Sequence, residues 1–440
     1  MSANTMTIKS NTDTVLEMPS LPGTLGPGRT AKVSCMTDDL LRALELGLLL
    51  IPDGANEPAG LPPVVFDHHY PEVLPVAASR AYYVRVLRGE AAFHDETSLR
   101  NFVAYYGDGA GMSCAFSDDG ITWDGEKEIT GIAANGYHVV CVMEAATRMR
   151  ILYWDPDVPS QPYNMDGLRT AVCNPLVDAS AFSEDTVCTG DIVTEGGIQV
   201  WNRGHYGPSF VWYNAHPTSV ANRPFTWRYA LYFIASTGGN DSLGLAYSDD
   251  AIAWQLYGDG PVISGIIDPQ PWEEPNGYIS SCHVERMADG RWWMLYSGGY
   301  MGNSGIGYAW SWDRIHWKKA DFNPVFSNGM GPFLQRCYTP CLVRDADGTF
   351  LLYRSVKDAS VYRTFVSRLR AVSLGTQDLL GPDHLAQGFA PRGTSFRGAG
   401  TQAQRDAIIP SPSLGDEWFN TDLPETGAWE KFTGMEWRTT

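Results

Sequence analysis

The chain has 440 residues, a formal net charge of −18 and an aromatic content of 12%. The negative charge argues against nucleic acids and anionic membranes as partners, because both attract clustered Lys and Arg. The start of the chain lacks an apolar segment behind positive charges, and the most apolar stretch, Leu40–Ile51, is interrupted by Arg42 and Glu45. We therefore expect a cytoplasmic protein that does not insert into a membrane.

The sequence offers no recognisable cofactor or metal motif. The eight cysteines are scattered without a CxxC pair, so we expect reduced thiols rather than a zinc site. No Gly-rich loop follows a strand and opens a helix, which argues against a nucleotide cofactor. The expected partner is a small-molecule substrate, bound with neither cofactor nor metal.

The N-terminal region, residues 1–79, is predicted to pack on the main domain. Residues 1–35 are rich in Ser, Thr, Gly and Pro and predict a poorly ordered arm. Thr37–Leu50 predicts a short helix, because Thr37 and Asp38 can cap its start and its leucines fall on one face.

Residues 80–375 contain an aromatic-rich strand pair that recurs five times. The copies are Arg80–Tyr106, Gly136–Trp154, His205–Ala235, Gly277–Ser297 and Arg336–Ser355. Three copies are followed by a Ser-x-Asp turn that ends in Trp, at Ala115–Trp123, Ala246–Trp254 and Ala309–Trp317. Repeated units of several short strands predict a β-propeller, because one blade cannot bury both of its faces alone. The Ser and Asp of each turn are expected to bind turn amides while the Trp packs between blades.

Residues 376–440 predict a loop and a closing β-hairpin. Gly393–Gln404 has few apolar residues, whereas Gly415–Asp422 and Trp429–Trp437 have the pattern of two paired strands. This short segment looks like the hairpins at the ends of some phage tail proteins, and its expected role is to cap or close a blade.

The Ser-Asp-Asp-Gly-Ile-Thr-Trp segment, residues 117–123, resembles the outer-strand repeat of five-bladed propeller glycosidases such as arabinanases, invertases and mannoside phosphorylases. The resemblance covers about residues 80–375. It implies an all-β fold, a five-bladed β-propeller with an N-terminal arm and short helix and a C-terminal β-hairpin extension. It also implies an Asp base, a second Asp and a Glu acid on the inner strands of three blades, since acetal hydrolysis uses paired carboxyls.

This chain departs from that pattern where the inner strands begin. Aligning the five copies places a ring without any Asp or Glu at the mouth of the propeller, namely Tyr82, His138, Tyr206, Ser280 and Tyr338. Further candidate lining residues are His205, Ser281, His283 and Thr339. Each tyrosine or histidine has a purely structural alternative, as a buried ring with a satisfied polar atom.

A neutral aromatic ring suits a polarised apolar molecule better than a sugar. The first hypothesis is therefore a cofactor-free cyclase of specialised metabolism that steers a hetero-Diels–Alder cycloaddition of a quinone-methide-like intermediate with a terpene. In size and fold type such a protein resembles the fungal hetero-Diels–Alderases of tropolonic sesquiterpene biosynthesis. His138, Tyr206, Tyr338 and Ser280 are then the predicted catalytic residues. The predicted substrate-binding residues are Tyr82, Ser281, His205, His283 and Thr339.

Two alternatives use the same architecture. The second hypothesis is a glycoside hydrolase or transglycosidase whose acids come from loops, with Glu273, Glu274 and Asp67 as candidates. Glu273-Glu274-Pro275 partly matches an acid motif of the propeller glycosidases, displaced by several residues. The third hypothesis is a carbohydrate-binding or phage-adsorption module without catalysis, suggested by the C-terminal hairpin.

Overall fold

The computed structural model describes most of the propeller and parts of both terminal regions. The described residues are 6–12, 15–18, 21, 24–33, 40, 43, 48–50, 64–70, 83–107, 111–124, 126–155, 167–190, 204–237, 240–273, 277–286, 291–299, 304–321, 323–326, 336–345, 349–358, 361–371, 396–400, 417–420, 428–432 and 437–439. Within them the protein is almost entirely β-structure, as predicted. No described helix is long and apolar enough to cross a bilayer.

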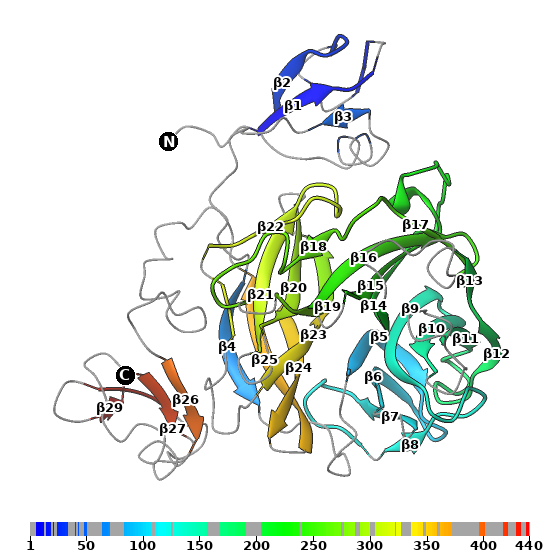
Figure 1. Ribbon diagram of the computed structural model, residues 1–440. Helices are drawn as coiled ribbons and strands as arrows, with labels where there is room; N and C mark the ends of the chain where they lie inside the picture. The colour runs from blue at the N-terminus through cyan, green and yellow to red at the C-terminus, as the bar shows by residue number, and fades with distance from the viewer. Residues whose placement is uncertain are drawn as a thin grey trace.

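Five antiparallel sheets surround a common axis and form the predicted five-bladed propeller (Figure 1). Blade 1 consists of β5 (Arg85–His94), β6 (Leu99–Gly107), β7 (Met112–Ser117) and β8 (Lys127–Glu128). Blade 2 consists of β9 (Tyr137–Ala145), β10 (Arg148–Trp154), β11 (Leu168–Cys173) and β12 (Ser183–Val187). Blade 3 consists of β14 (Gly204–Tyr213), β15 (Tyr229–Thr237), β16 (Asn240–Ser248) and β17 (Ala253–Leu256), with the short β13 (Thr189–Gly190) and β18 (Ile263–Ser264) at its outer side.

Blade 4 consists of β19 (Ile279–Arg286), β20 (Trp292–Gly298), β21 (Gly305–Ser311) and β22 (Lys318–Lys319). Blade 5 consists of β23 (Arg336–Arg344), β24 (Phe350–Asp358), β25 (Val361–Ala371) and β4 (Val64–Tyr70). The first strand of each blade contacts the first strand of the next, and β23 contacts β5, so the inner strands form a closed ring. Five hydrophobic clusters lie between the blades, one at each interface.

The ring is closed by a strand from before blade 1. β4 pairs antiparallel with β25 and supplies the outermost strand of blade 5. The propeller therefore begins at residue 64, inside the region assigned from sequence to the N-terminal arm. This arrangement joins the two ends of the propeller, because blade 5 takes its outermost strand from the segment before blade 1.

The C-terminal strands pair with each other and complete no blade within the described residues. They are β26 (Phe396–Gly400), β27 (Glu417–Asn420), β28 (Ala428–Phe432) and β29 (Trp437–Thr439). The predicted hairpin is present as β27 and β28, and β26 and β29 extend it to a four-stranded sheet. The blade-closing role expected for this hairpin is taken by β4 instead.

A small N-terminal sheet replaces the expected disordered arm. It contains β1 (Met6–Ser10), β2 (Thr30–Val33) and β3 (Leu49–Leu50), in the order β2-β1-β3. Leu40 and Ala43 are helical and buried beneath it, but Leu49–Leu50 form a strand, so the predicted helix does not reach Leu50. Trp312 of blade 4 packs against this cluster.

The three Ser-x-Asp turns have the structure expected from the sequence. In the first, Asp119 Oδ1 accepts hydrogen bonds from the amides of Ile121 and Thr122 at 2.8 and 2.7 Å, and the Trp123 indole donates to the Gly120 carbonyl. The same bonds recur in the turns that begin at Ser248 and at Ser311.

Each turn also receives a bond from the preceding blade. The Tyr353 hydroxyl of blade 5 donates to the Gly120 carbonyl at 2.6 Å, and Tyr232 of blade 3 donates to the Arg314 carbonyl at 2.5 Å. The residue at this position has a positive φ in all three turns, 73° at Gly120, 61° at Ala251 and 65° at Arg314. The repeat therefore joins neighbouring blades as well as closing its own turn.

Candidate functional site

The candidate site lies on the face of the propeller where the inner strands begin. Four of these starts contain a residue with positive φ at the same relative place: Tyr83 (52°), His138 (55°), Gly207 (112°) and Thr339 (55°). On β19 the register with β20 shifts at Ser280. These five positions lie at the same place in their blades, where the inner strand begins, and are taken together as the ring at the mouth of the propeller.

The ring differs by one residue from the predicted one in blades 1 and 5. Tyr83 takes the place assigned to Tyr82, which lies outside the described residues, and Thr339 takes the place assigned to Tyr338. In blade 5 the prediction counted the strand as regular, whereas a bulge shifts its register between Tyr338 and Cys341. Tyr206 and His205 lie on β14, but their side chains are outside the described residues.

The axis is filled at this level by Tyr83. Its ring stacks on the imidazole of His138, with the centroids 3.5 Å apart and the planes tilted by 31°. Tyr83 also belongs to the hydrophobic cluster shared by blades 3 and 4, so its side chain reaches across the axis. Tyr83 is 3% exposed and His138 is 5% exposed. The predicted catalytic residue His138 is thus packed against Tyr83, the neighbour of the predicted Tyr82.

The hydroxyl groups of the ring bind other strands. Ser281 Oγ lies 2.7 Å from Ser297 Oγ, and the Thr339 amide donates to the same Ser297 oxygen at 2.6 Å. Thr339 Oγ1 donates to Ser355 Oγ at 2.5 Å. Ser280, Ser281 and Thr339 are all buried. The bond from Thr339 to Ser297 joins blade 5 to blade 4, whereas the other two bonds lie within a blade.

His283 lies deeper along β19. Its ring packs edge-to-face on Phe210 of β14, with the centroids 4.9 Å apart. Burial, followed by the positive charge of Arg85, lowers the pKa of His283 to about 3, so the imidazole is neutral at physiological pH. His283 is therefore not available as a general acid near neutrality.

Glu273, one of the alternative acids, is held in a buried network at the base of the loop before β19. Its carboxylate accepts hydrogen bonds from Lys319 Nζ at 2.7 Å, the Tyr296 hydroxyl at 2.9 Å and the Gln270 amide at 2.9 Å. Glu273 is 0% exposed, and the Lys319 side chain is 3% exposed. A carboxylate enclosed in this way is a structural counter-ion, and its hydrogen-bond partners among the described residues lie outside the ring.

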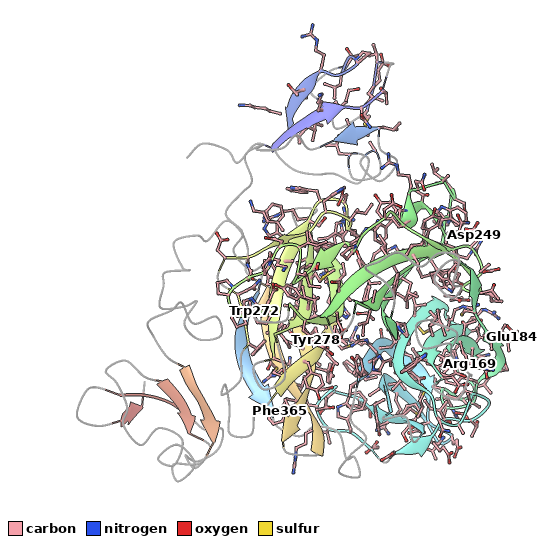
Figure 2. The ribbon with its side chains drawn as sticks, in the orientation of Figure 1. Arg169, Glu184, Asp249, Trp272, Tyr278 and Phe365 are labelled. Atoms are coloured by element: carbon pink, nitrogen blue, oxygen red, sulfur yellow. The ribbon has the colours of Figure 1, made fainter. Side chains whose placement is uncertain are left out.

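The side chains of the other two alternative acids, Asp67 and Glu274, lie outside the described residues. Asp67 lies on β4, the outermost strand of blade 5, and is thus separated from the axis by three strands; its side chain is outside the described residues. Glu274 also lies outside them, between Trp272 and Tyr278, which are labelled in Figure 2.

One buried carboxylate near the ring was missed by the sequence analysis. Asp155 directly follows β10, and the preceding Trp154 lies 6.2 Å from His138 between ring centroids. Its Oδ2 is 3.7 Å from Arg169 Nη1, and the residue is 5% exposed. The available signal was its position at the end of the second strand of a repeated pair. The described residues contain no cluster of His, Cys, Asp and Glu that could hold a metal ion.

Comparisons with known proteins establish the fold. No protein-family model matches the chain, and no curated protein matches it. A solved glycoside hydrolase matches 77% of this chain and 96% of its own, with a TM-score of 0.53 and 12% identity. A thermostable family-43 glycoside hydrolase matches 69% of this chain and 96% of its own, with a TM-score of 0.50 and 14% identity. Neither supports the cycloaddition hypothesis or the hetero-Diels–Alderase resemblance, and the chain shares with both a five-bladed β-propeller.

Proposed function

We propose that the chain is a glycoside hydrolase or transglycosidase of the five-bladed propeller type whose acids come from loops. The observation that carries this proposal is the match to nearly the whole length of a solved glycoside hydrolase. At 12% identity the match establishes architecture, and the activity is an inference from it. The cyclase hypothesis has no comparable support.

The residue types at the ring positions restrict where the catalytic carboxyl groups can lie. None of the five ring positions, Tyr83, His138, Gly207, Ser280 and Thr339, carries a carboxylate. Glycosidic cleavage generally needs two carboxyl groups, about 5–5.5 Å apart for retention or about 6.5–9.5 Å apart for inversion. Because Tyr83 fills the axis, the substrate must bind above the ring, where loop residues supply the acids.

Two loop carboxylates are the best candidates. Asp155 directly follows β10, and its Oδ2 lies 3.7 Å from Arg169 Nη1. Glu274 adjoins the rigid Glu273 network in sequence and is retained as the acid proposed from the sequence. Glu273 itself is excluded from this role by its buried pairing with Lys319.

A panel of 4-nitrophenyl glycosides tests the proposal. We expect slow but measurable chromophore release, lowered by about 10²–10⁴-fold in Glu274→Gln or Asp155→Asn. Glu273→Gln is the matched control: once folded, it should keep its activity although its stability falls. Release that survives both Glu274→Gln and Asp155→Asn would contradict the assignment of the acids. Absence of release across α- and β-linked hexosides, pentosides and uronides would contradict the hydrolase proposal.

A second candidate is a carbohydrate-binding protein without catalysis. The neutral, packed ring favours it, because the inner-strand positions that bear acids in propeller glycosidases bear none here. A glycan array distinguishes the two: tight binding without turnover of the bound glycan supports binding alone. Loss of product formation in the acid variants, with binding retained, supports the hydrolase.

A further inference from the structure

A buried arginine lies on the propeller axis next to the ring. Arg85, on β5, is 4% exposed. Its Nη1 donates to the carbonyls of Val84 and Pro340 at 3.2 and 3.1 Å, and its Nη2 donates to the carbonyl of Ser209 at 2.7 Å. One guanidinium group thus joins blades 1, 3 and 5.

The charge of Arg85 has no counter-ion among the described residues. Its hydrogen-bond partners there are three carbonyl oxygens, and none is a carboxylate. Carbonyl dipoles satisfy N–H groups but leave the net charge in place, and an isolated buried charge is strongly unfavourable. The axis therefore has a positive charge that its described surroundings do not neutralise.

Two buried nitrogen atoms near this charge also lack hydrogen-bond partners in the described part of the chain. They are Nε of Arg85 and Nδ1 of His283. Arg85 binds the carbonyl of Ser209, and His283 packs on the adjacent Phe210, so both groups border the same two residues of β14. Unsatisfied buried polar atoms are rare in native proteins, and a bound ion or water commonly explains them.

The geometry points to an anion site on the propeller axis, in which Nε of Arg85 and Nδ1 of His283 bind a small monovalent anion of the chloride class. The neutral imidazole can carry its proton on Nδ1, and this N–H group can donate a hydrogen bond to the anion. A water molecule would satisfy the two nitrogen atoms but would leave the guanidinium charge unpaired. Both nitrogen atoms are inaccessible to solvent, so the ion proposed here is a small one that carries no hydration shell of its own into the site. This proposal does not depend on glycosidase activity.

Bromide provides the direct test. Crystals of the full chain grown in bromide should show an anomalous peak beside Arg85 Nε and His283 Nδ1. In solution, the urea midpoint of the halide-free protein should rise with the logarithm of chloride or bromide concentration at constant ionic strength, as expected for a ligand that binds the folded state. Sulfate should not substitute, although as a kosmotropic salt it would stabilise more by general effects. Absence of the peak together with equal midpoints in halide and sulfate would overturn the proposal.

Substitutions test which residues produce the halide-dependent shift of the urea midpoint. Arg85→Met should abolish the halide-dependent shift, and Arg88→Met, on the same strand but paired with Asp345 at 3.5 Å, should retain it. Because Arg85→Met removes an inter-blade clamp and can prevent folding, His283→Phe serves as the second variant. It keeps the aromatic contact with Phe210 and removes Nδ1, so the halide dependence should weaken. An undiminished halide shift in His283→Phe or Arg85→Met would overturn the assignment of these residues.

Discussion

The buried pair of Glu273 and Lys319 offers the sharpest test of the site geometry. We predict that Glu273→Gln destabilises the propeller far more than it alters catalysis. The carboxylate accepts three hydrogen bonds, and Lys319 also donates to the carbonyls of Ser264 and Asp268 at 2.8 and 2.6 Å. The substitution turns an amide NH₂ toward these donors and leaves the Lys319 charge without its partner.

The expected loss is large because both groups are removed from water. Breaking a buried ion pair by removing one partner typically costs about 3–5 kcal/mol, since the remaining charge stays buried. The exposed pair of Lys127 and Glu96, also 2.8 Å apart, provides a matched control, because the Glu96 side chain is 64% exposed. Glu96→Gln should cost no more than about 1 kcal/mol.

Urea unfolding followed by tryptophan fluorescence measures both variants. The Trp272 indole donates to Gln270 Oε1 at 2.9 Å, so its emission should respond to disruption of this network. The double variant Glu273→Gln/Lys319→Met removes both charges and should recover at least about 2 kcal/mol relative to the sum of the single changes. A loss below about 1 kcal/mol for Glu273→Gln, or strictly additive single changes, would refute the view of a desolvated pair.

Three further predictions follow from individual contacts. Tyr353→Phe leaves the Gly120 carbonyl without its inter-blade donor and should lower the unfolding free energy by about 1–3 kcal/mol, measured in urea. Gly207→Ala should cost at least about 1 kcal/mol, because φ is 112° and the new Cβ would lie 3.0 Å from Cβ of His138; an unchanged thermal midpoint would contradict this. Since the pKa of His283 is lowered to about 3, the unfolded chain binds a proton below about pH 6.5 that the folded chain does not. In halide-free buffer the stability should therefore fall as pH drops below that value, with a shallower fall in His283→Phe.

Local features of the fold could be predicted from the sequence, because short-range chemistry determines them. The Ser-x-Asp turns close through bonds between residues two to five apart, so the sequence repeat was enough to predict their structure and the number of blades. The outer strand of blade 5 could not be found in this way. β4 and β25 are almost 300 residues apart, and no local pattern identifies which edge a strand joins.

The ring and its acids were predicted less well for two physical reasons. A bulge adds one residue to a strand without a distinctive sequence signal, so in blade 5 the ring position falls on Thr339 and not on Tyr338. The function of Glu273 depends on Lys319, a partner 46 residues away that no spacing rule indicates. The same argument applies to Asp155, whose proximity to the ring results from the pairing of β9 with β10.

The packing of the axis constrains any catalytic account of this protein. Tyr83 occupies the position that an open funnel would need to leave empty, and Arg85 fixes the strands beside it through carbonyls of three blades. Such a centre is a rigid support, because its polar groups bind backbone and its aromatic groups pack against each other. In the proposed hydrolase, the carboxylates that act on the sugar would have to come from loops such as those that contain Asp155 and Glu274. Replacing those loops should therefore change activity with little effect on the propeller, whereas changes at Tyr83 or Arg85 should affect folding first.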